Sequence, residues 1–149
     1  MPKFHGTSLL GLLAATLVFY IIGFVWYGIL FDAMWMELSG ITLEEATANN
    51  EKLGIMMYVW GLLISFAQVL GLNYLVNLGR ASRLKACVKV CVKVAVLIAL
   101  PILGYSALYG GAPVKLLAID FGHMLIGYIA VGAVLAAFRG KDAIGEGDS

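Results

Sequence analysis

Two ionisable side chains, Asp120 and His123, lie inside a long apolar run and are the first residues that could do chemistry. They are three residues apart, so a helix would place both on one face. A carboxylate beside an imidazole can share or relay a proton, hold the polar group of a ligand, or supply part of a metal site. Ionisable residues within membrane spans usually face a bundle interior or a watery cavity, so this pair is the leading hypothesis for a functional site.

The run that carries this pair, residues 116–138, is long enough to cross a bilayer. At a rise of about 1.5 Å per residue it would extend roughly 34 Å, and the hydrocarbon core of a bilayer is about 30 Å thick. Three further stretches have a similar length and apolar character, at about 9–31, 54–78 and 86–108. The sequence therefore predicts an all-α fold, an integral membrane four-helix bundle in a single domain over residues 1–149.

The composition supports a membrane protein and argues against other classes. Hydrophobic residues make up 62% of the chain and charged residues 13%, against about 25% charged residues in ordinary soluble domains. The net charge of +1 gives no argument for nucleic acid, because binding a polyanion needs a clustered basic surface on a soluble scaffold. The sequence has no nucleotide-binding glycine loop and no G-x-S-x-G motif, so no catalytic residue and no cofactor is predicted.

Between the first two predicted helices lies an acidic segment, residues 32–53, which we expect to be extramembrane. Within it, Thr42 and Glu45 form a T-x-x-E capping box, which predicts a short surface helix over about residues 43–49. After the fourth predicted helix, residues 139–149 form a polar tail.

The third predicted helix begins in a basic block and contains a proline. Pro101 removes an internal hydrogen bond and should kink the helix. Cys87 and Cys91 are spaced for one helical face in a segment that we place in the cytoplasm. We therefore expect free thiols there rather than a disulfide.

The distribution of Lys and Arg predicts the orientation. With four spans, both termini and the loop between the second and third helices lie on one side of the membrane. That side carries Lys3, Arg80, Arg83, Lys85, Lys89, Lys93, Arg139 and Lys141. The other side carries only Lys52 and Lys115. By the positive-inside rule, both termini are cytoplasmic, and we expect a multi-pass protein of the bacterial inner (plasma) membrane.

This threading places Asp120 and His123 near the outer surface, together with aromatic and acidic residues of other helices. The candidates for a ligand or proton site beside the pair are Trp26, Tyr27, Asp32 and Tyr58, with Trp60 and Tyr105 at a similar depth. Two structural explanations compete. The pair could satisfy each other and fix the helix register, and the aromatic residues could form a belt at headgroup level. No metal is predicted, because zinc needs three or four ligands and the other histidine, His5, lies at the opposite face.

Polar residues elsewhere have two interpretations each. Gln68, Asn73 and Asn77 fit interhelical hydrogen bonds, or else a polar translocation path. Basic side chains just cytoplasmic of a membrane helix are attracted to anionic headgroups, although control of topology alone would also explain them. The lipid-headgroup candidates are Arg80, Arg83, Lys85, Lys89 and Lys93.

Two stretches of the chain, WYGILFDAMWMELSGIT at residues 26–42 and KLLAIDFGHMLIGYIAVGAVLAAF at 115–138, point to a family. With them the chain resembles the small bacterial membrane proteins grouped as domain of unknown function 1761. The matching positions are Trp26, Tyr27, Trp35, Met36, Leu38 and Gly40. Family members commonly have Ser-Pro after the Trp-Tyr pair, where this chain has Gly28 and Ile29. The resemblance implies a four-helix membrane fold, and it carries no reaction or substrate.

Three classes of function are compatible with these observations. We expect first a binding, interaction or structural membrane subunit. Its partners would be a bilayer with anionic headgroups and either further copies of the chain, as a homo-oligomer, or a larger membrane complex. The alternative is an oligomeric small-solute or proton-coupled transporter or channel that uses Asp120 and His123. An enzyme is the weakest of the three, because no convincing nucleophile or cofactor site is present.

Overall fold

The computed structural model describes residues 3–139, and the chain is helical there apart from a short hairpin at the beginning. Four helical stretches of 22 to 27 residues are long and apolar enough to cross a membrane. They are Leu9–Leu30, Ile55–Leu78, Leu84–Gly110 and Val114–Phe138. The structure confirms the predicted all-helical class and indicates a multi-pass membrane protein.

The first span is not one uninterrupted α-helix. Helix α1 (Leu9–Val25) begins at Ser8, whose Oγ accepts the Gly11 N–H at 3.2 Å, a typical N-cap. From Trp26 to Leu30 the chain continues as the π-helical segment η1, in which the Phe31 N–H bonds the Trp26 carbonyl at 2.9 Å. The wider turn changes the direction of the side chains at the end of this span.

The segment between the first two spans contains two helices, α2 (Asp32–Ser39) and α3 (Leu43–Leu53). The predicted capping box is confirmed, because the Thr42 hydroxyl accepts the Glu45 N–H and the Glu45 carboxylate accepts the Thr42 N–H. The sequence predicted one short helix over about residues 43–49, and the helical part of this segment is longer than that. Helix α3 continues to Leu53, and α2 precedes it, ending at Gly40 in the left-handed conformation that favours glycine.

The third span also contains a π-helical segment. It consists of α5 (Leu84–Val94), η2 (Ala95–Ala99) and α6 (Leu100–Gly110). Pro101 lies in the first turn of α6, where its missing N–H leaves the preceding turn without a regular α-helical bond. The π-helical turn directly before it is where the helix accommodates that loss. A change of helix type thus directly precedes Pro101, where the sequence predicts a kink.

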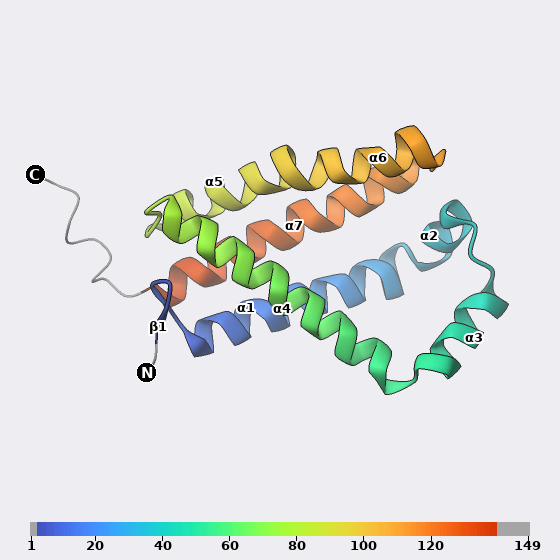
Figure 1. Ribbon diagram of the computed structural model, residues 1–149, viewed down its shortest axis with the longest axis horizontal. Coiled ribbons are helices and arrows are strands. Elements are labelled where there is room, and N and C mark those ends of the chain that lie inside the picture. Colours follow the sequence, from blue (N-terminus) through green and yellow to red (C-terminus); the bar gives the residue numbers. More distant parts are fainter. Residues whose placement is uncertain (1–2, 140–149) are drawn as a thin grey trace, which may run out of the picture.

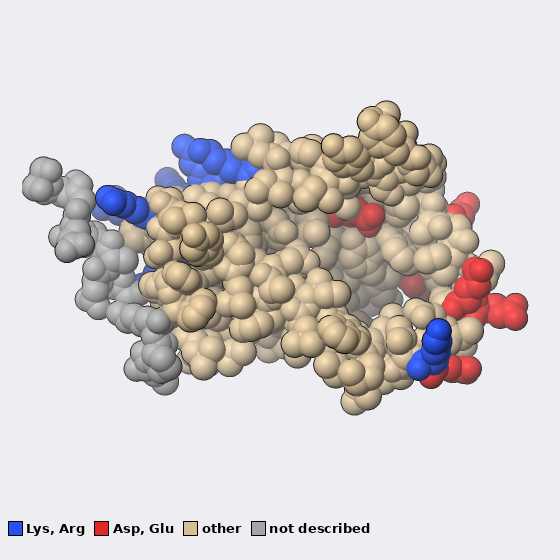
Figure 2. Space-filling model, viewed as in Figure 1, with Lys and Arg blue, Asp and Glu red and all other residues tan. Residues whose placement is uncertain are grey.

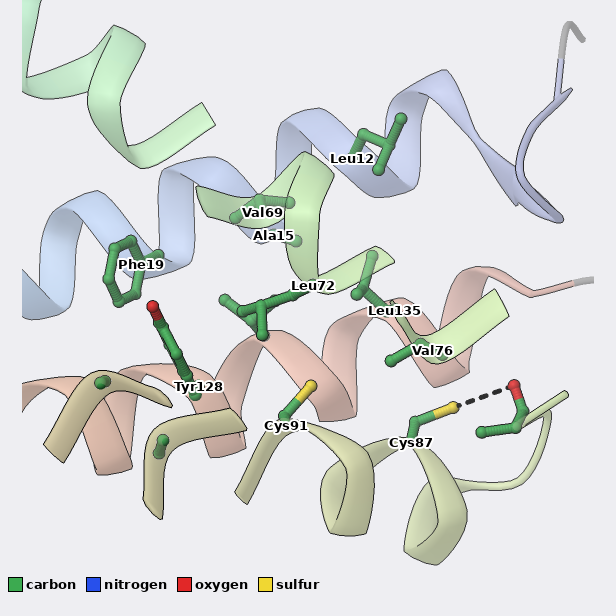
Figure 3. Close-up of a cluster of buried hydrophobic side chains, with 14 residues drawn as sticks. Leu12, Ala15, Phe19, Val69, Leu72, Val76, Cys87, Cys91, Tyr128 and Leu135 are labelled. Carbon is green, nitrogen blue, oxygen red and sulfur yellow. Dashed lines mark hydrogen bonds between the residues drawn. The ribbon is translucent and has the colours of Figure 1, made fainter. Parts of the chain in front are cut away.

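The other three spans pack against α7 (Val114–Phe138). Figure 1 shows α1 and the α5–α6 stretch running beside α7, with α4 (Ile55–Leu78) crossing them, and α7 has extensive contacts with both α1 and α5. Figure 3 shows side chains from all four spans meeting in the buried cluster, including Phe19, Leu72, Cys91 and Tyr128. The core is therefore a shared interior of the spans.

Glycines on α7 allow its neighbours to approach closely. A Cβ atom at Gly127 would lie 2.4 Å from the ring of Phe19 on α1. At Gly132 it would lie 3.1 Å from the backbone of Val88 on α5. Small residues at helix contacts are how membrane helices pack without a hydrophobic driving force between them.

A polar cluster closes one end of the molecule. At this end α1 begins, α7 ends and the chain passes from α4 to α5. The hairpin of β1 (Lys3–Phe4) and β2 (Thr7–Ser8) covers this end, and the Thr7 hydroxyl donates to Asn73 Oδ1 at 2.7 Å. Arg139, just after α7, donates to Asn77 Oδ1 at 3.0 Å. The sequence analysis did not predict this hairpin, and residues 140–149 of the predicted polar tail, with Lys141, lie outside the described residues.

Charge separates along the long axis, as Figure 2 shows. Lys and Arg gather over the start of α5, which we call the basic end. Asp and Glu gather over α2 and α3, the acidic end. Lys85, Lys89 and Lys93 are all exposed on α5, and Cys87 and Cys91 face the core from its other side.

Replacing Gly127 by Ala is expected to lower the midpoint of thermal unfolding of the purified protein, followed by circular dichroism in detergent. The new Cβ would lie 2.4 Å from the buried Phe19 ring, which has to move. Overpacking of this kind costs about 1–3 kcal/mol in the free energy of unfolding. The control is Gly71→Ala, whose Cβ meets nothing within 4 Å and which should be at least as stable as the wild type. Equal midpoints for the two variants would contradict the close contact.

Candidate functional site

The carboxylate of Asp120 is the centre of the polar contacts at the acidic end. Its Oδ1 accepts a hydrogen bond from the Tyr27 hydroxyl at 3.0 Å and another from the Trp35 indole N–H at 3.2 Å. Tyr27 lies in η1 and Trp35 in α2, so two consecutive elements near the beginning of the chain meet α7, near its end, at one oxygen atom. No described residue donates to the second carboxylate oxygen, Oδ2, which is left for a ligand or solvent.

Trp35 is a site residue that the sequence analysis missed. The sequence placed it in an acidic surface segment, but its ring packs edge-on against Tyr27 with centroids 5.7 Å apart. The signal that could have found it is its indole N–H, which needs an acceptor wherever the ring is partly buried. Trp26, which the sequence analysis did single out, donates instead to the Ile119 carbonyl at 3.0 Å. Trp26 therefore bonds to the backbone of α7, and it is not a donor to the Asp120 carboxylate.

His123 lies next to Asp120 on α7 but makes different contacts. No hydrogen bond joins the two side chains. The imidazole packs among aromatic rings, with centroid distances of 5.0 Å to Tyr27 and 5.2 Å to Phe19. Its Nε2 atom is buried and has no hydrogen-bond partner among the described residues. A Cβ atom at Gly23 would lie 3.2 Å from that nitrogen, so the glycine gives the imidazole its space on α1.

An open cleft of about 1010 Å³ lies beside Asp120, and we call it the Asp120 cleft. Its polar lining includes the carboxylates of Asp32, Glu45 and Asp120. Aromatic and apolar side chains form most of the remaining walls, among them Phe24, Tyr27, Trp35, Met36, Ile41, Met57, Tyr58, Leu103 and Met124. Figure 2 shows the hollow between the helices, with acidic side chains in it. The structure thus brings together Asp120, Tyr27, Asp32 and Tyr58 of the predicted candidates.

A second space, of about 320 Å³, adjoins this cleft. We call it the His123 cavity. The two spaces share four lining residues, Phe24, Tyr27, Met57 and Tyr58. Ser65 and Gln68 of α4 add polar groups to its lining, and Gln68 Oε1 accepts the Tyr128 hydroxyl at 3.0 Å. Gln68 therefore forms the interhelical hydrogen bond that was one of its two interpretations. Trp60 and Tyr105, expected at the same depth, are exposed and line neither space.

The charge of the Asp120 cleft is negative. Its described lining contains three carboxylates and no Lys, Arg or His. Hydrogen bonds from the backbone and the side chain of Thr42 lower the pKa of Glu45, so this carboxylate is ionised at neutral pH. Within residues 3–139, no three His, Cys, Asp or Glu side chains are grouped so that they could hold a metal ion.

The two cysteines belong to the core. Both are free thiols, as predicted, and both are fully buried. Figure 3 shows Cys87 and Cys91 pointing from α5 into the buried cluster. The Cys87 thiol donates a hydrogen bond to the Ala81 carbonyl, with 3.5 Å between sulfur and oxygen. They take no part in either space at the acidic end.

The comparisons with known proteins agree with the expected family. A family sequence model described as "Protein of unknown function (DUF1761)" matches residues 10–136. This confirms the resemblance seen in the sequence. The match includes Tyr27, Trp35, Asp120 and His123. No curated protein and no solved structure matches the chain.

Replacing Tyr27 by Phe is expected to lower the free energy of unfolding by about 1.5–3 kcal/mol, the usual contribution of a hydrogen bond to a charged group. The loss should be much smaller in an Asp120→Leu background, because the acceptor is absent there. A double-mutant cycle in detergent measures this coupling. Tyr20→Phe is the control, since its exposed hydroxyl makes only a 3.4 Å bond to the Tyr58 carbonyl. An equal cost of Tyr27→Phe in both backgrounds would show that the bond to Asp120 contributes nothing.

Proposed function

We propose that this chain, which belongs to the DUF1761 family, is a multi-pass membrane protein that binds a small amphipathic molecule in the Asp120 cleft. The observation that carries the proposal is the cleft itself, about 1010 Å³ of largely apolar and aromatic space with a carboxylate held in its wall by two donors. Binding sites for small molecules typically combine apolar walls with a few well-placed polar groups.

Two features support a binding role for this cleft. The Asp120 carboxylate is oriented in advance by Tyr27 and Trp35, so a ligand would meet a group that does not have to rearrange. The walls come from all parts of the acidic end, including Glu45 of α3 and Leu103 of α6. Such a site exists only in the folded chain, and its shape is set by the packing of the spans.

Binding is better supported than transport, the other function expected from the sequence. Transport would need a path that continues beyond the His123 cavity toward the basic end. In that direction α4 presents Val69, Leu72 and Val76, each at most 2% exposed. These side chains pack in the apolar core, and the hairpin lies beyond them. The interior thus resembles a closed receptor more than a channel.

We also propose an orientation and a location for the protein. The spans would form a four-helix bundle in the bacterial inner membrane, with both termini cytoplasmic and α2 and α3 at the outer surface. The separation of charge between the two ends supports this orientation. The Asp120 cleft would then open toward the outer side of the membrane.

The basic end suits contact with anionic lipids. Lys85, Lys89 and Lys93 are exposed along one side of α5, and Arg83 precedes them at its N-cap. Basic side chains at this position gain about 1 kcal/mol each from anionic headgroups. Assembly into a homo-oligomer or a larger membrane complex stays a prediction.

Replacing Ala46 by Trp is expected to block part of the Asp120 cleft, because Ala46 of α3 lines it. The probe is Nile red, an uncharged apolar dye, titrated into purified protein in detergent and followed by its fluorescence. We expect saturable binding to the wild type and a dissociation constant at least about tenfold higher for the variant.

Ala48→Trp is the matched control for this substitution. It adds the same side chain to the same helix at an exposed position outside the cleft lining. Its dye affinity should stay close to that of the wild type. Absence of saturable binding to the wild type, or an equal effect of the two substitutions, would contradict the proposed function.

The proposed orientation predicts which introduced cysteines react from outside. In bacterial spheroplasts, a membrane-impermeant maleimide should label Thr47→Cys on α3, whereas Ser82→Cys at the basic end should react only after the membrane is permeabilised. The wild type gives the background, which should be low because Cys87 and Cys91 are fully buried. The reverse pattern of labelling would contradict cytoplasmic termini.

A further inference from the structure

Three features of the Asp120 cleft together indicate the chemical class of its ligand. The first is charge. Asp32, Glu45 and Asp120 line the cleft, and no basic residue is among its described lining. A carboxylate attracts cations and repels anions, and it does so more strongly at Asp120, which is partly buried, than at the exposed Asp32 and Glu45.

The second feature is an accessible oxygen atom at Asp120. Both protein donors, Tyr27 and Trp35, bond the same oxygen, Oδ1. Oδ2 has no donor among the described residues, and it is not one of the buried atoms without a partner. A carboxylate in this state can still accept a strong, charge-assisted hydrogen bond or form an ion pair with a ligand.

The third feature is the nature of the walls. Aromatic rings attract cations through their π faces, and Tyr27, Trp35 and Tyr58 all line the cleft. Much of the remaining lining is apolar and adaptable, with Met57 and Met124 among it. Walls of this kind can pack against the hydrocarbon part of a ligand. If the ligand also has a charged group, these walls favour a positive charge over a negative one.

We infer that the Asp120 cleft binds an amphipathic organic cation, an alkylammonium or a similar lipophilic cation. The cationic group lies against Asp120 Oδ2 and the aromatic rings, and the hydrocarbon part lies along the methionines. Asp32 and Glu45 add attraction from the outer part of the cleft. This inference rests on the proposed function, since it names the ligand class of the same site.

A matched pair of probes tests the sign of the charge. Tetraphenylphosphonium and tetraphenylborate have nearly the same shape and apolar surface but opposite charges. Radiolabelled probe is equilibrated by dialysis with the purified full chain in a non-ionic detergent. We expect saturable binding of the cation that is at least about tenfold tighter than that of the anion. Equal affinities, or tighter binding of the anion, would overturn the inference.

Two variants test the carboxylates. Asp120→Asn should weaken binding of the phosphonium at least about tenfold and leave Nile red binding nearly unchanged. Asp32→Asn, at an exposed position of the cleft, should weaken phosphonium binding less than Asp120→Asn does. This second variant keeps the test independent of any effect of Asp120 on folding. Glu37→Gln is the control, because it removes a charge from the same helix outside the cleft lining. If phosphonium affinity is the same in Asp120→Asn, Asp32→Asn and wild type, the inference is wrong.

The same cationic chemistry occurs on free amphipathic amines and on the headgroup of phosphatidylethanolamine. Competition separates the two sources. Displacement of the phosphonium by decyltrimethylammonium below its micellar concentration supports a free cation. Displacement by short-chain phosphatidylethanolamine supports a lipid, and displacement by neither overturns the inference.

The dye titration separates the two proposals. If Nile red binds and Ala46→Trp weakens its binding while the two charged probes bind alike, the ligand class is wrong and the proposed function stands. If neither the dye nor the charged probes show saturable binding, both proposals fail.

Discussion

The hydrogen bonds that Asp120 accepts are the interaction on which the acidic end of this structure depends. A carboxylate within an apolar helix is costly unless donors surround it. Tyr27 and Trp35 supply those donors, one from the π-helical end of the first span and one from α2. Because α2 must lie against α7 to deliver the Trp35 indole, the chain folds back over the spans after Leu30. That fold-back forms a wall of the Asp120 cleft.

The position of Asp120 depends in turn on how closely α7 packs against its neighbours. A Cβ atom at Gly122 would lie 2.9 Å from the Trp26 ring, and Gly127 and Gly132 face α1 and α5 at similarly short distances. Larger side chains at these positions would push α7 outward. The carboxylate would then move away from its donors, so the glycines contribute to the site without lining it.

The two ends of the molecule differ in their polar contacts. At the basic end, Arg139 donates to the amides of Asn73 and Asn77, and Asn73 donates to the hairpin, while Arg139 Nε is buried without a partner among the described residues. At the acidic end, one oxygen of Asp120 and one nitrogen of His123 have no described partner. The accessible oxygen of Asp120 lines the Asp120 cleft, so it is the group that a ligand in the cleft would meet.

The sequence by itself determined the elements whose signals are local. The spans follow from apolar runs, the start of α3 from the capping box at Thr42, and the free thiols from the spacing and setting of Cys87 and Cys91. Only the tertiary structure decided which side chains meet. The contacts of Asp120 with Trp35 and Tyr27 join residues 85 and 93 positions apart. Such contacts depend on how the helices rotate about their axes and cross one another. Because hydropathy is nearly the same on all sides of these helices, the sequence does not indicate which side of one helix faces its neighbour.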